Sequence, residues 1–395
     1  MTAPLALVTP PLEATEGWIL QTDPDFSEGD LAAVDTVLRG SNLGAGEQVA
    51  QMEAAFAAYV GRRYAIAVSS GTMGLYLTLL GMNVGPGDEV ILSAHGYREA
   101  GHAVALTGAK PVFADIDYWA GTLASEKAAA KITPATKAIL GGNANGHPAA
   151  WPELREVAAQ HGLHLIEDST EAIGSRHKAG MVGSFGDAAI FDFGQPGVIA
   201  CGEGGIVVTD DIDLAMALRR RRSRRPDERH SLSLTSAPPF QAGMSDVVAA
   251  LALSQLRRID LLLERRRSVQ LLYDHFMQSF EGIKPPYIAP DVEEVHWFLY
   301  VVHLGTRFTR SARDQIIEDM RTEEIDVAAY SAPLHLQDFY RQLGWKKKDL
   351  FVTEKVADRA LALPFHAHLT EDQIAFVVSR AKESSINIGA GTPIY

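Results

Sequence analysis

The sequence predicts an α/β protein with a mostly parallel sheet in a large domain, followed by a smaller α+β domain. Apolar runs bounded by turn residues alternate with helical patterns from about residue 30 to 210, as in a parallel sheet with helices on both faces. The chain of 395 residues is too long for one simple core and suits two domains. Beyond residue 277, strand-like and helical patterns indicate the second domain.

Seven short apolar runs in the first part of the chain read as buried strands. They are residues 64–70, 89–94, 110–116, 137–143, 164–169, 187–193 and 205–210. Between them, residues 73–84, 101–109 and 151–162 are each long enough for a helix. Ligands of such sheets bind at the carboxyl ends of the strands, so we expect the functional site there.

An apolar pattern at helical spacing runs over residues 245–277 and is long enough to bridge two domains. We place the domain boundary within it, with a large domain over 1–265 and a small domain over 266–395. The segments 296–304, 313–325 and 371–384 indicate the small α+β domain, whereas 387–395 reads as an extended tail without a helical signal.

Composition excludes several classes of protein. The formal net charge is −13, which argues against general nucleic-acid binding because that needs a basic surface. The single cysteine, Cys201, excludes an intramolecular disulfide and fits a reducing compartment. The sequence has no apolar run of about 18 residues and its start lacks a basic signal-peptide region, so we expect a cytoplasmic protein away from membranes.

One local cluster departs from this acidic average. Six arginines occupy the seven positions 219–225. Two interpretations remain open: a solvated helix end, or a docking site for a phosphate or carboxylate, which arginine binds bidentately.

Eight motifs follow one another along the chain. They are SSGTMGL (69–75), GPGDEVILSA (85–94), PVFADID (111–117), IEDSTEAIGS (166–175), VGSFGDAAIFDF (182–193), CGEGG (201–205), MSDVVAALALSQLRRID (244–260) and LALPFHAHLT (361–370). Together they resemble the DegT/DnrJ/StrS family of sugar aminotransferases, which use pyridoxal phosphate (PLP) on a fold type I architecture. The resemblance extends from about Asp30 to Lys382. It implies a two-fold dimer in which residues 236–244 of one chain complete the site of the other.

Several positions keep a role that this resemblance implies. Gly71 and Thr72 lie at a strand-to-helix turn, where backbone N–H groups and a hydroxyl can hold an anion; the alternative for Thr72 is a simple helix N-cap. Asp168 matches the carboxylate that pairs with the pyridine nitrogen of the cofactor, and we expect it to face a polar cavity because an unpartnered buried carboxylate is costly. Tyr97 matches the aromatic residue that stacks on the cofactor ring.

Other positions depart from the family pattern. Gly197 stands where the family has the lysine that forms the PLP imine, so neither an imine nor its proton transfer is possible there. Asp192 replaces a serine that binds the cofactor phosphate, and a carboxylate beside a dianion is repelled. Gln241 replaces an asparagine that reaches the phosphate of the neighbouring subunit. Glu171 replaces a glutamine, and Asn143 replaces a histidine. We therefore expect no cofactor, with non-covalent PLP or pyridoxamine phosphate (PMP) as the alternative.

Titratable residues at the strand ends offer another chemistry. They are His95, Glu99, His102, His147, Glu171 and Asp192. A histidine–carboxylate pair moves protons near neutral pH. Histidine and glutamate also bind metals, but no HExxH-like spacing occurs and we predict no metal site. The alternative for each residue taken alone is a polar group on a loop whose hydrogen bonds are already made. As a set, they predict His95 as the main acid–base group, with His147, Glu171 and Asp192 as partners, and Arg98 attracting anionic substrate groups.

These features lead to three functional hypotheses. The first is a biosynthetic enzyme of a sugar or antibiotic pathway that acts without PLP on a small polar metabolite, as a cyclase, dehydratase, isomerase or condensing enzyme, and forms a homodimer. The second is an enzyme of dehydratase or aminotransferase type that holds PMP or PLP non-covalently. The third is a catalytically silent subunit that pairs with a lysine-bearing relative in a heterodimer. We do not expect conventional transamination.

Overall fold

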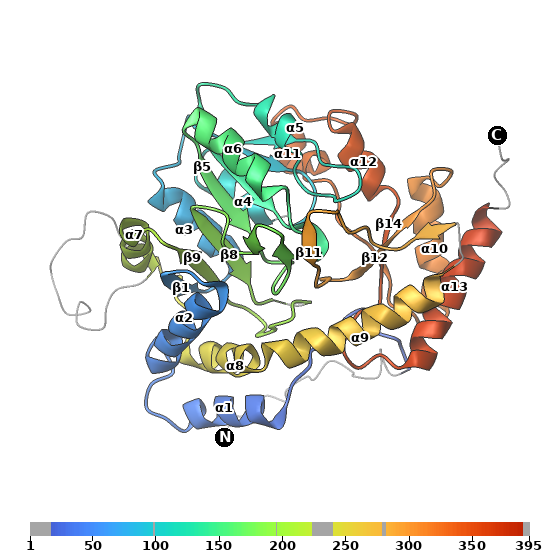
Figure 1. Cartoon of the computed structure of the whole chain (residues 1–395), viewed down its shortest axis with the longest axis horizontal. Helices are drawn as coiled ribbons and strands as arrows, with labels where there is room; N and C mark the ends of the chain where they lie inside the picture. The colour runs from blue at the N-terminus through green and yellow to red at the C-terminus, as the bar shows by residue number, and fades with distance from the viewer. Residues whose placement is uncertain (1–16, 98, 195, 223–239, 279–281, 390–395) are drawn as a thin grey trace, which may run out of the picture.

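The computed structural model describes residues 17–97, 99–194, 196–222, 240–278 and 282–389. It confirms the predicted α/β architecture, with a large sheet at one end of the molecule and a smaller one at the other (Figure 1). The large sheet has seven strands in the order β1-β9-β8-β5-β4-β2-β3. They are β1 (Tyr64–Val68), β2 (Glu89–Ser93), β3 (Lys110–Ala114), β4 (Thr136–Gly142), β5 (His164–Asp168), β8 (Ala188–Asp192) and β9 (Gly205–Thr209). Six of these strands lie within a predicted run, and β4 begins at Thr136, one residue before the run 137–143.

The direction of the strands brings their carboxyl ends to one edge. Strands β3, β2, β4, β5 and β8 pair in parallel, and only β9 runs against its two neighbours, β8 and β1. Gly142 at the end of β4 is paired with Asp168 at the end of β5. The ends of β2, β4, β5 and β8 therefore meet along the edge where the sequence predicts the site.

Helices cover both faces of this sheet. The predicted helices are α3 (Gly71–Gly81), α4 (Glu99–Leu106) and α6 (Trp151–His161). The remaining helices of this part are α1 (Glu28–Leu38), α2 (Glu47–Val60), α5 (Ser125–Ala129) and α7 (Ile212–Arg222). On β8, Ile190 packs into one hydrophobic core with α3 and α7, whereas Ala189 and Phe191 pack into another with α2 and α8. This alternation is the period-two pattern of a strand buried on both faces.

The long pattern over 245–277 forms two helices instead of one. Helix α8 (Asp246–Arg257) and helix α9 (Ile259–Met277) are separated at Arg258, whose backbone leaves the helical region at φ −116° and ψ 22°. The Arg258 guanidinium is held there by Asp30, at 2.6 Å, and by Asp25, at 3.2 Å. Helix α9 runs from the large domain to the small one (Figure 1), so the predicted boundary at 265/266 falls inside a continuous helix.

The small domain contains an antiparallel sheet in the order β10-β12-β14-β13. Its strands are β10 (Ile283–Lys284), β12 (Tyr300–Leu304), β13 (Ala328–Ala329) and β14 (Ala360–Leu363), and its helices are α10 (Arg310–Thr322), α11 (Asp338–Gln342), α12 (Phe351–Ala357) and α13 (Glu371–Gly389). Helix α13 includes residues 387–389, so the expectation of an extended tail is wrong for these three. Ile388 packs against the core of the small domain, which accounts for the longer helix. Residues 390–395 lie outside the described part.

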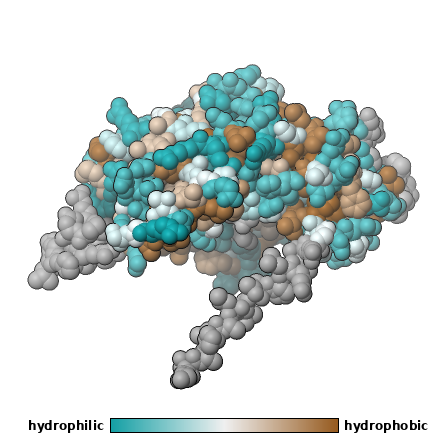
Figure 2. All heavy atoms as spheres, turned by 90° about the horizontal axis from the view of Figure 1, so that it is seen from below, coloured by the Kyte–Doolittle hydropathy of each residue, from teal (hydrophilic) through white to brown (hydrophobic). Residues whose placement is uncertain are grey.

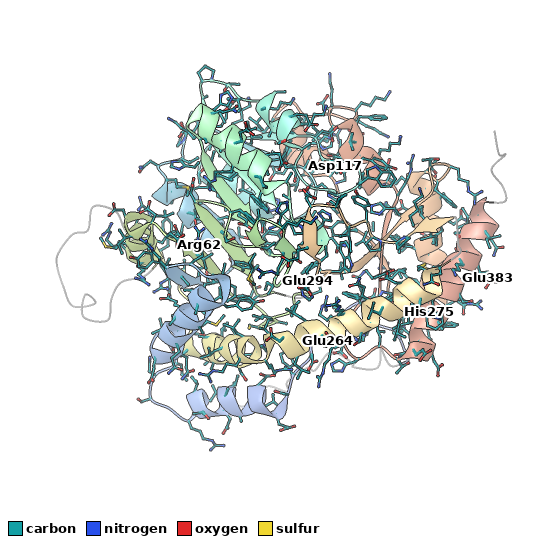
Figure 3. All side chains as sticks on the ribbon, viewed as in Figure 1. Arg62, Asp117, Glu264, His275, Glu294 and Glu383 are labelled. Carbon is teal, nitrogen blue, oxygen red and sulfur yellow. The ribbon has the colours of Figure 1, made fainter. Side chains whose placement is uncertain are left out.

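A third, three-stranded sheet joins the two domains. It contains β6 (Arg176–His177), β7 (Gly180–Met181) and β11 (Val292–Glu294) in the order β11-β6-β7. Glu294 on β11 lies near α9 (Figure 3) and pairs with Arg267 of that helix at 3.2 Å. This sheet therefore ties the large domain to the segment that follows α9.

Figure 2 shows one face of the molecule. The face in Figure 2 is mostly hydrophilic with scattered apolar areas. Among the described residues, no helix combines the length and the apolar character that crossing a membrane requires. In the arginine cluster, Arg222 and Arg219 both form ion pairs with Glu53 on α2, and Arg222 also donates to the Ala67 carbonyl at 2.8 Å. Residues 223–225 of the cluster lie outside the described part.

Candidate active site

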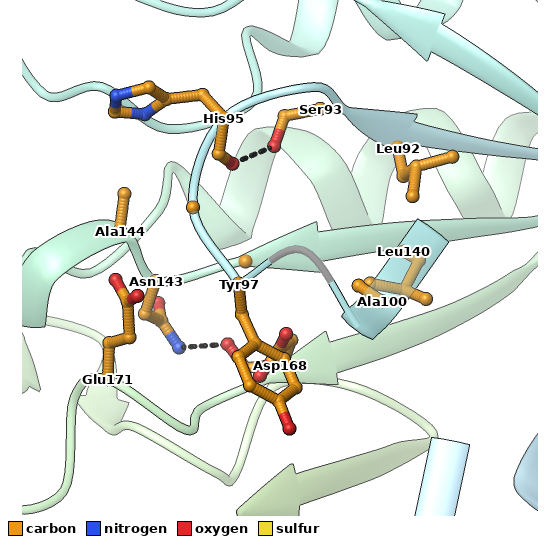
Figure 4. Close-up of a pocket in the computed structure, with 12 residues that line it drawn as sticks. Leu92, Ser93, His95, Tyr97, Ala100, Leu140, Asn143, Ala144, Asp168 and Glu171 are labelled. Carbon is orange, nitrogen blue, oxygen red and sulfur yellow. Dashed lines mark hydrogen bonds between the residues drawn. The ribbon is translucent and has the colours of Figure 1, made fainter. Parts of the chain in front are cut away.

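A cavity opens at the carboxyl ends of β2, β4 and β5 (Figure 4). Its walls are Leu92, Ser93, His95, Gly96, Tyr97, Ala100, Leu140, Gly142, Asn143, Ala144, Asp168 and Glu171. Five residues that the sequence singled out thus line one space. Its innermost volume is about 20 Å³, enough for a water molecule. A larger ligand must therefore extend outward from it.

Asp168 is the buried carboxyl group of this cavity, with 4% of its surface exposed. Its Oδ1 accepts a hydrogen bond from the Thr170 N–H at 3.1 Å. Among the described residues, no lysine or arginine forms an ion pair with it. Burial, reinforced by the nearby Glu171 and Asp192 carboxylates, raises the pKa of Asp168 to about 7. Asp168 can therefore take up or release a proton near neutral pH.

Tyr97 lies beside Asp168, on the loop that leads from β2 to α4 (Figure 4). Its hydroxyl is within hydrogen-bonding reach of Thr72 in the first turn of α3. Burial raises the pKa of Tyr97 well above its ordinary value, and the Asp192 and Asp168 carboxylates raise it further. The tyrosine is therefore a neutral hydrogen-bond donor throughout the physiological range.

Asp192 sits at the end of β8 and faces the N-terminus of α3. Its Oδ2 accepts a hydrogen bond from the Gly71 N–H at 2.6 Å, and its Oδ1 accepts one from the Gly194 N–H at 2.7 Å. A helix N-terminus favours an anion, and here the anion is the protein's own carboxylate. Ser70, not Thr72, caps α3: its hydroxyl accepts from the Met73 N–H at 3.2 Å, so the N-cap alternative for Thr72 is wrong.

Asn143 and Glu171 line the cavity with polar atoms that are already engaged. The Asn143 carbonyl oxygen accepts from the Ala149 N–H and from the Trp151 indole at 2.9 and 2.8 Å. Glu171 Oε2 accepts from the Tyr330 hydroxyl and from the Asn145 N–H, both at 2.6 Å. Burial raises the pKa of Glu171. Because Tyr330 belongs to the small domain, Glu171 connects the two domains beside the cavity.

The histidines lie apart from Asp168. The backbone of His95 borders the cavity, but its ring points away from Tyr97 and Asp168 (Figure 4) and forms a 2.9 Å hydrogen bond with the Gly121 carbonyl. His147 lines a neighbouring chamber; its Nδ1 bonds to the Pro148 carbonyl at 2.7 Å, and its Nε2 accepts from the Ala289 N–H at 3.1 Å. His102 stacks on Tyr340. The structure thus does not join His95 to Asp192 or Glu171 as the predicted acid–base partners.

Gly197 and Gln241 lie outside this cavity. Gly197 lines a separate space with Asp25, Arg266 and Phe365 among others. A Cβ at position 197 would lie 3.0 Å from both the Gly194 and the Ile199 carbonyl oxygens, so this loop leaves little room for any side chain. Gln241 is exposed in the single chain, and Arg98 lies outside the described residues.

Two residues that line the neighbouring chamber were missed in the sequence. Tyr330 and His303 come from the small domain, more than 120 positions after Asp168 in the chain. His303 stands in the apolar part of the run 296–304, between Val302 and Leu304, and a histidine at that place was the available signal. Among the described residues, no three histidine, cysteine, aspartate or glutamate side chains are grouped as metal ligands.

Comparison with known proteins identifies the family. The model of the DegT/DnrJ/EryC1/StrS aminotransferase family matches residues 24–382. The chain belongs to this family. It is 32% identical over 371 residues to the spore coat polysaccharide biosynthesis protein SpsC of Bacillus subtilis (strain 168), covering 91% of this chain and 95% of SpsC. It is 35% identical over 337 residues to GDP-perosamine synthase of Caulobacter vibrioides, covering 85% and 89%.

A solved structure gives the same result for the fold. The crystal structure of S. venezuelae DesV in complex with a ketimine intermediate is 32% identical and superposes with a TM-score of 0.83, covering 90% of this chain and 94% of DesV. The fold is therefore the fold type I of the aminotransferases, as the sequence motifs predict. The protein is a member of a family of sugar aminotransferases.

The family's cofactor fits this site only at one end. Asp168 and Tyr97 line the same cavity, so a carboxyl group and an aromatic side chain are available to a pyridine ring there. At the other end, Asp192 already occupies the N–H of Gly71 at the start of α3 and places a negative charge where a phosphate would bind. Gly197 offers no amine, and its loop crowds an added side chain. These residues do not fit lysine-bound PLP.

Proposed function

We propose that this protein is a biosynthetic enzyme that acts on a small, polar, sugar-like metabolite through its own acid–base side chains, without PLP. The observation that carries the proposal is the pair of carboxyl groups at the strand ends. Asp192 is fixed on α3 by two backbone N–H groups, whereas Asp168 is buried without an ion-pair partner among the described residues and has a pKa near neutrality. The two carboxylates thus have different environments and different tasks.

In the proposed mechanism, Asp168 moves the proton. Its carboxylate removes a proton from substrate bound at the outer side of the cavity and returns it elsewhere on the substrate or to a leaving hydroxyl group. The Tyr97 and Thr72 hydroxyls orient the substrate by hydrogen bonds. The apolar walls at Leu92, Ala100 and Leu140 limit access of water. The reaction classes that this supports are isomerisation and dehydration.

A second candidate is an enzyme that holds PMP or PLP without a covalent bond. A relative favours it, since DesV was solved in complex with a ketimine intermediate. The placement of Asp168 and Tyr97 also suits a pyridine ring. Such a cofactor would supply an electron-accepting ring. Asp192 is the observation against it.

Absorption spectra separate the two candidates. After incubation with PLP or PMP and removal of the free cofactor, we expect a colourless protein, because the Asp192 carboxylate repels the phosphate and position 197 has no amine. A visible or near-ultraviolet cofactor band that stays with the protein would instead establish the second candidate. Reduction with borohydride, followed by mass spectrometry, then shows whether any other lysine has formed an imine.

We further propose that the protein forms a two-fold homodimer. Gln241 is exposed and belongs to residues 236–244, the segment that the family resemblance places across the subunit interface. Obligate interfaces of this kind bury roughly 2,000 Å² or more, so the dimer should persist at micromolar concentration. Light scattering of the purified chain tests this. A monomer would contradict the proposal, and a dimer formed only with a lysine-bearing relative would indicate the silent-subunit hypothesis.

A further inference from the structure

A second chamber adjoins the candidate active site, and His95 and Ala144 belong to the walls of both. Its other walls are Trp119, Ala120, Gly121, Asn145, His147, Pro286, Tyr287, Trp297, Val301, His303, Tyr330 and Val356. These residues come from loops of the large domain and from the small domain. None of them is an aspartate, glutamate, lysine or arginine. The inner volume is about 30 Å³, room for a group of a few atoms.

His95 presents an unused hydrogen-bond acceptor in this wall. Its Nδ1 lies 2.9 Å from the Gly121 carbonyl, which can only accept, so Nδ1 carries the proton and Nε2 carries a lone pair. The side chain is 7% exposed, and Nε2 has no hydrogen-bond partner among the described residues. A buried polar atom without a partner is costly unless a ligand or water supplies the bond.

The rest of the chamber disfavours charge. Burial lowers the pKa of His95 to about 4, and burial together with the nearby His95 lowers that of His303 to about 4. Both imidazoles are therefore neutral at pH 7. The Tyr330 ring packs edge-on against His95, with the ring centroids 5.3 Å apart. The Trp119 and Tyr287 rings, which are 53% and 41% exposed, mark the side that is open to solvent.

We propose that this chamber binds an uncharged arm of the substrate that carries a hydroxyl or amide N–H group, with His95 Nε2 accepting its hydrogen bond. The inference rests on the proposed function only in assigning the arm to the substrate that reacts at Asp168. A carboxylate arm has no proton to donate to His95. Moving it from water into the chamber would also be costly, because no cationic side chain lines the chamber to neutralise its charge. An ammonium arm would also be buried among neutral groups. The chamber thus selects substrates by excluding charge.

Small probes test the chamber without any turnover. With protein labelled with ¹⁵N at histidine, acetamide, acetate and methylammonium are titrated at pH 7 while the ring nitrogen signals are followed by NMR. We expect acetamide to shift the His95 and His303 signals saturably, with a dissociation constant of roughly millimolar. Acetate and methylammonium should leave both signals in place. His275, which is exposed on α9 (Figure 3), provides the internal reference.

Substitution of the acceptor completes the test. His95→Phe keeps an aromatic ring at this position but removes both nitrogens, the Nε2 lone pair among them, so acetamide should bind at least about tenfold more weakly through the loss of its buried hydrogen bond. His303→Leu leaves His95 Nε2 in place and should therefore still bind acetamide. It is the second variant to measure if His95→Phe does not fold. The proposal is overturned if acetamide causes no saturable shift or if acetate shifts His95 equally. Because no cofactor or activity enters the measurement, failure of the proposed function leaves this result unaffected.

Discussion

Asp168→Asn is expected to stabilise the folded protein at pH 8 while reducing its turnover by about a hundredfold or more. In the proposed mechanism this side chain is the base, and asparagine of nearly the same shape cannot accept the proton. Its amide oxygen still accepts the Thr170 N–H bond. Turnover of the wild type should rise with pH to a plateau above about pH 7, because the carboxylate is the base. The residual activity of the variant should lack this rise.

The gain in stability follows from the raised pKa. Below pH 4 the carboxyl group is protonated in both the folded and the unfolded chain. Between pH 4 and 7 the unfolded chain loses its proton first, so the free energy of unfolding falls as the pH rises. Above pH 7 the full cost of the buried charge is present. A rise from 3.8 to about 7 corresponds to roughly 4 kcal/mol.

Urea unfolding at pH 5 and pH 8 measures this difference. The stabilisation of Asp168→Asn relative to the wild type should be clearly larger at pH 8 than at pH 5. Glu203→Gln is the matched control, because Glu203 is an exposed carboxylate of the loop before β9 and should give no such pH dependence. Equal stability of the wild type and the Asp168 variant at pH 8 would show that Asp168 has a partner that neutralises its charge.

The sequence contains most of the fold because local patterns determine the strands. All seven apolar runs form strands of one sheet, and five of them pair in parallel as predicted, whereas β9 runs antiparallel to β8 and β1. The break between α8 and α9 was not predictable from periodicity. It depends on Asp25 and Asp30, which are more than 200 positions before Arg258 and hold its guanidinium. A continuous apolar pattern cannot report such a distant contact.

In the candidate site, too, the directions of individual side chains depend on contacts with residues far away in the sequence. Asp168 and Tyr97 both line the cavity, because the sheet brings the ends of β2 and β5 to the same edge. The direction of the His95 ring was not predictable, since it depends on the Gly121 carbonyl in another loop. His303 and Tyr330 reach the neighbouring chamber only through the packing of the small domain on the large one. Sequence motifs identify residues at the strand ends but not the direction in which each side chain points.

Asp192→Ser is expected to increase the affinity for PMP by at least about a hundredfold. In the wild type, the Asp192 carboxylate accepts the hydrogen bond of the Gly71 N–H, which a phosphate would need. It also adds a negative charge beside the position where the phosphate would bind. Two unit charges about 4 Å apart near a protein surface repel each other by roughly 4 kcal/mol, and a phosphate dianion is repelled more strongly. Serine removes the charge and frees the backbone donor at the start of α3.

Equilibrium dialysis against PMP measures this change, because PMP forms no imine and so reports the phosphate and ring contacts alone. Glu203→Gln also removes one negative charge but leaves the Gly71 N–H occupied, so its affinity should remain that of the wild type. Tyr97→Ala, added to Asp192→Ser, should weaken the binding again through loss of ring stacking. If Asp192→Ser binds PMP no better than the wild type, the carboxylate at α3 is not what keeps the phosphate out.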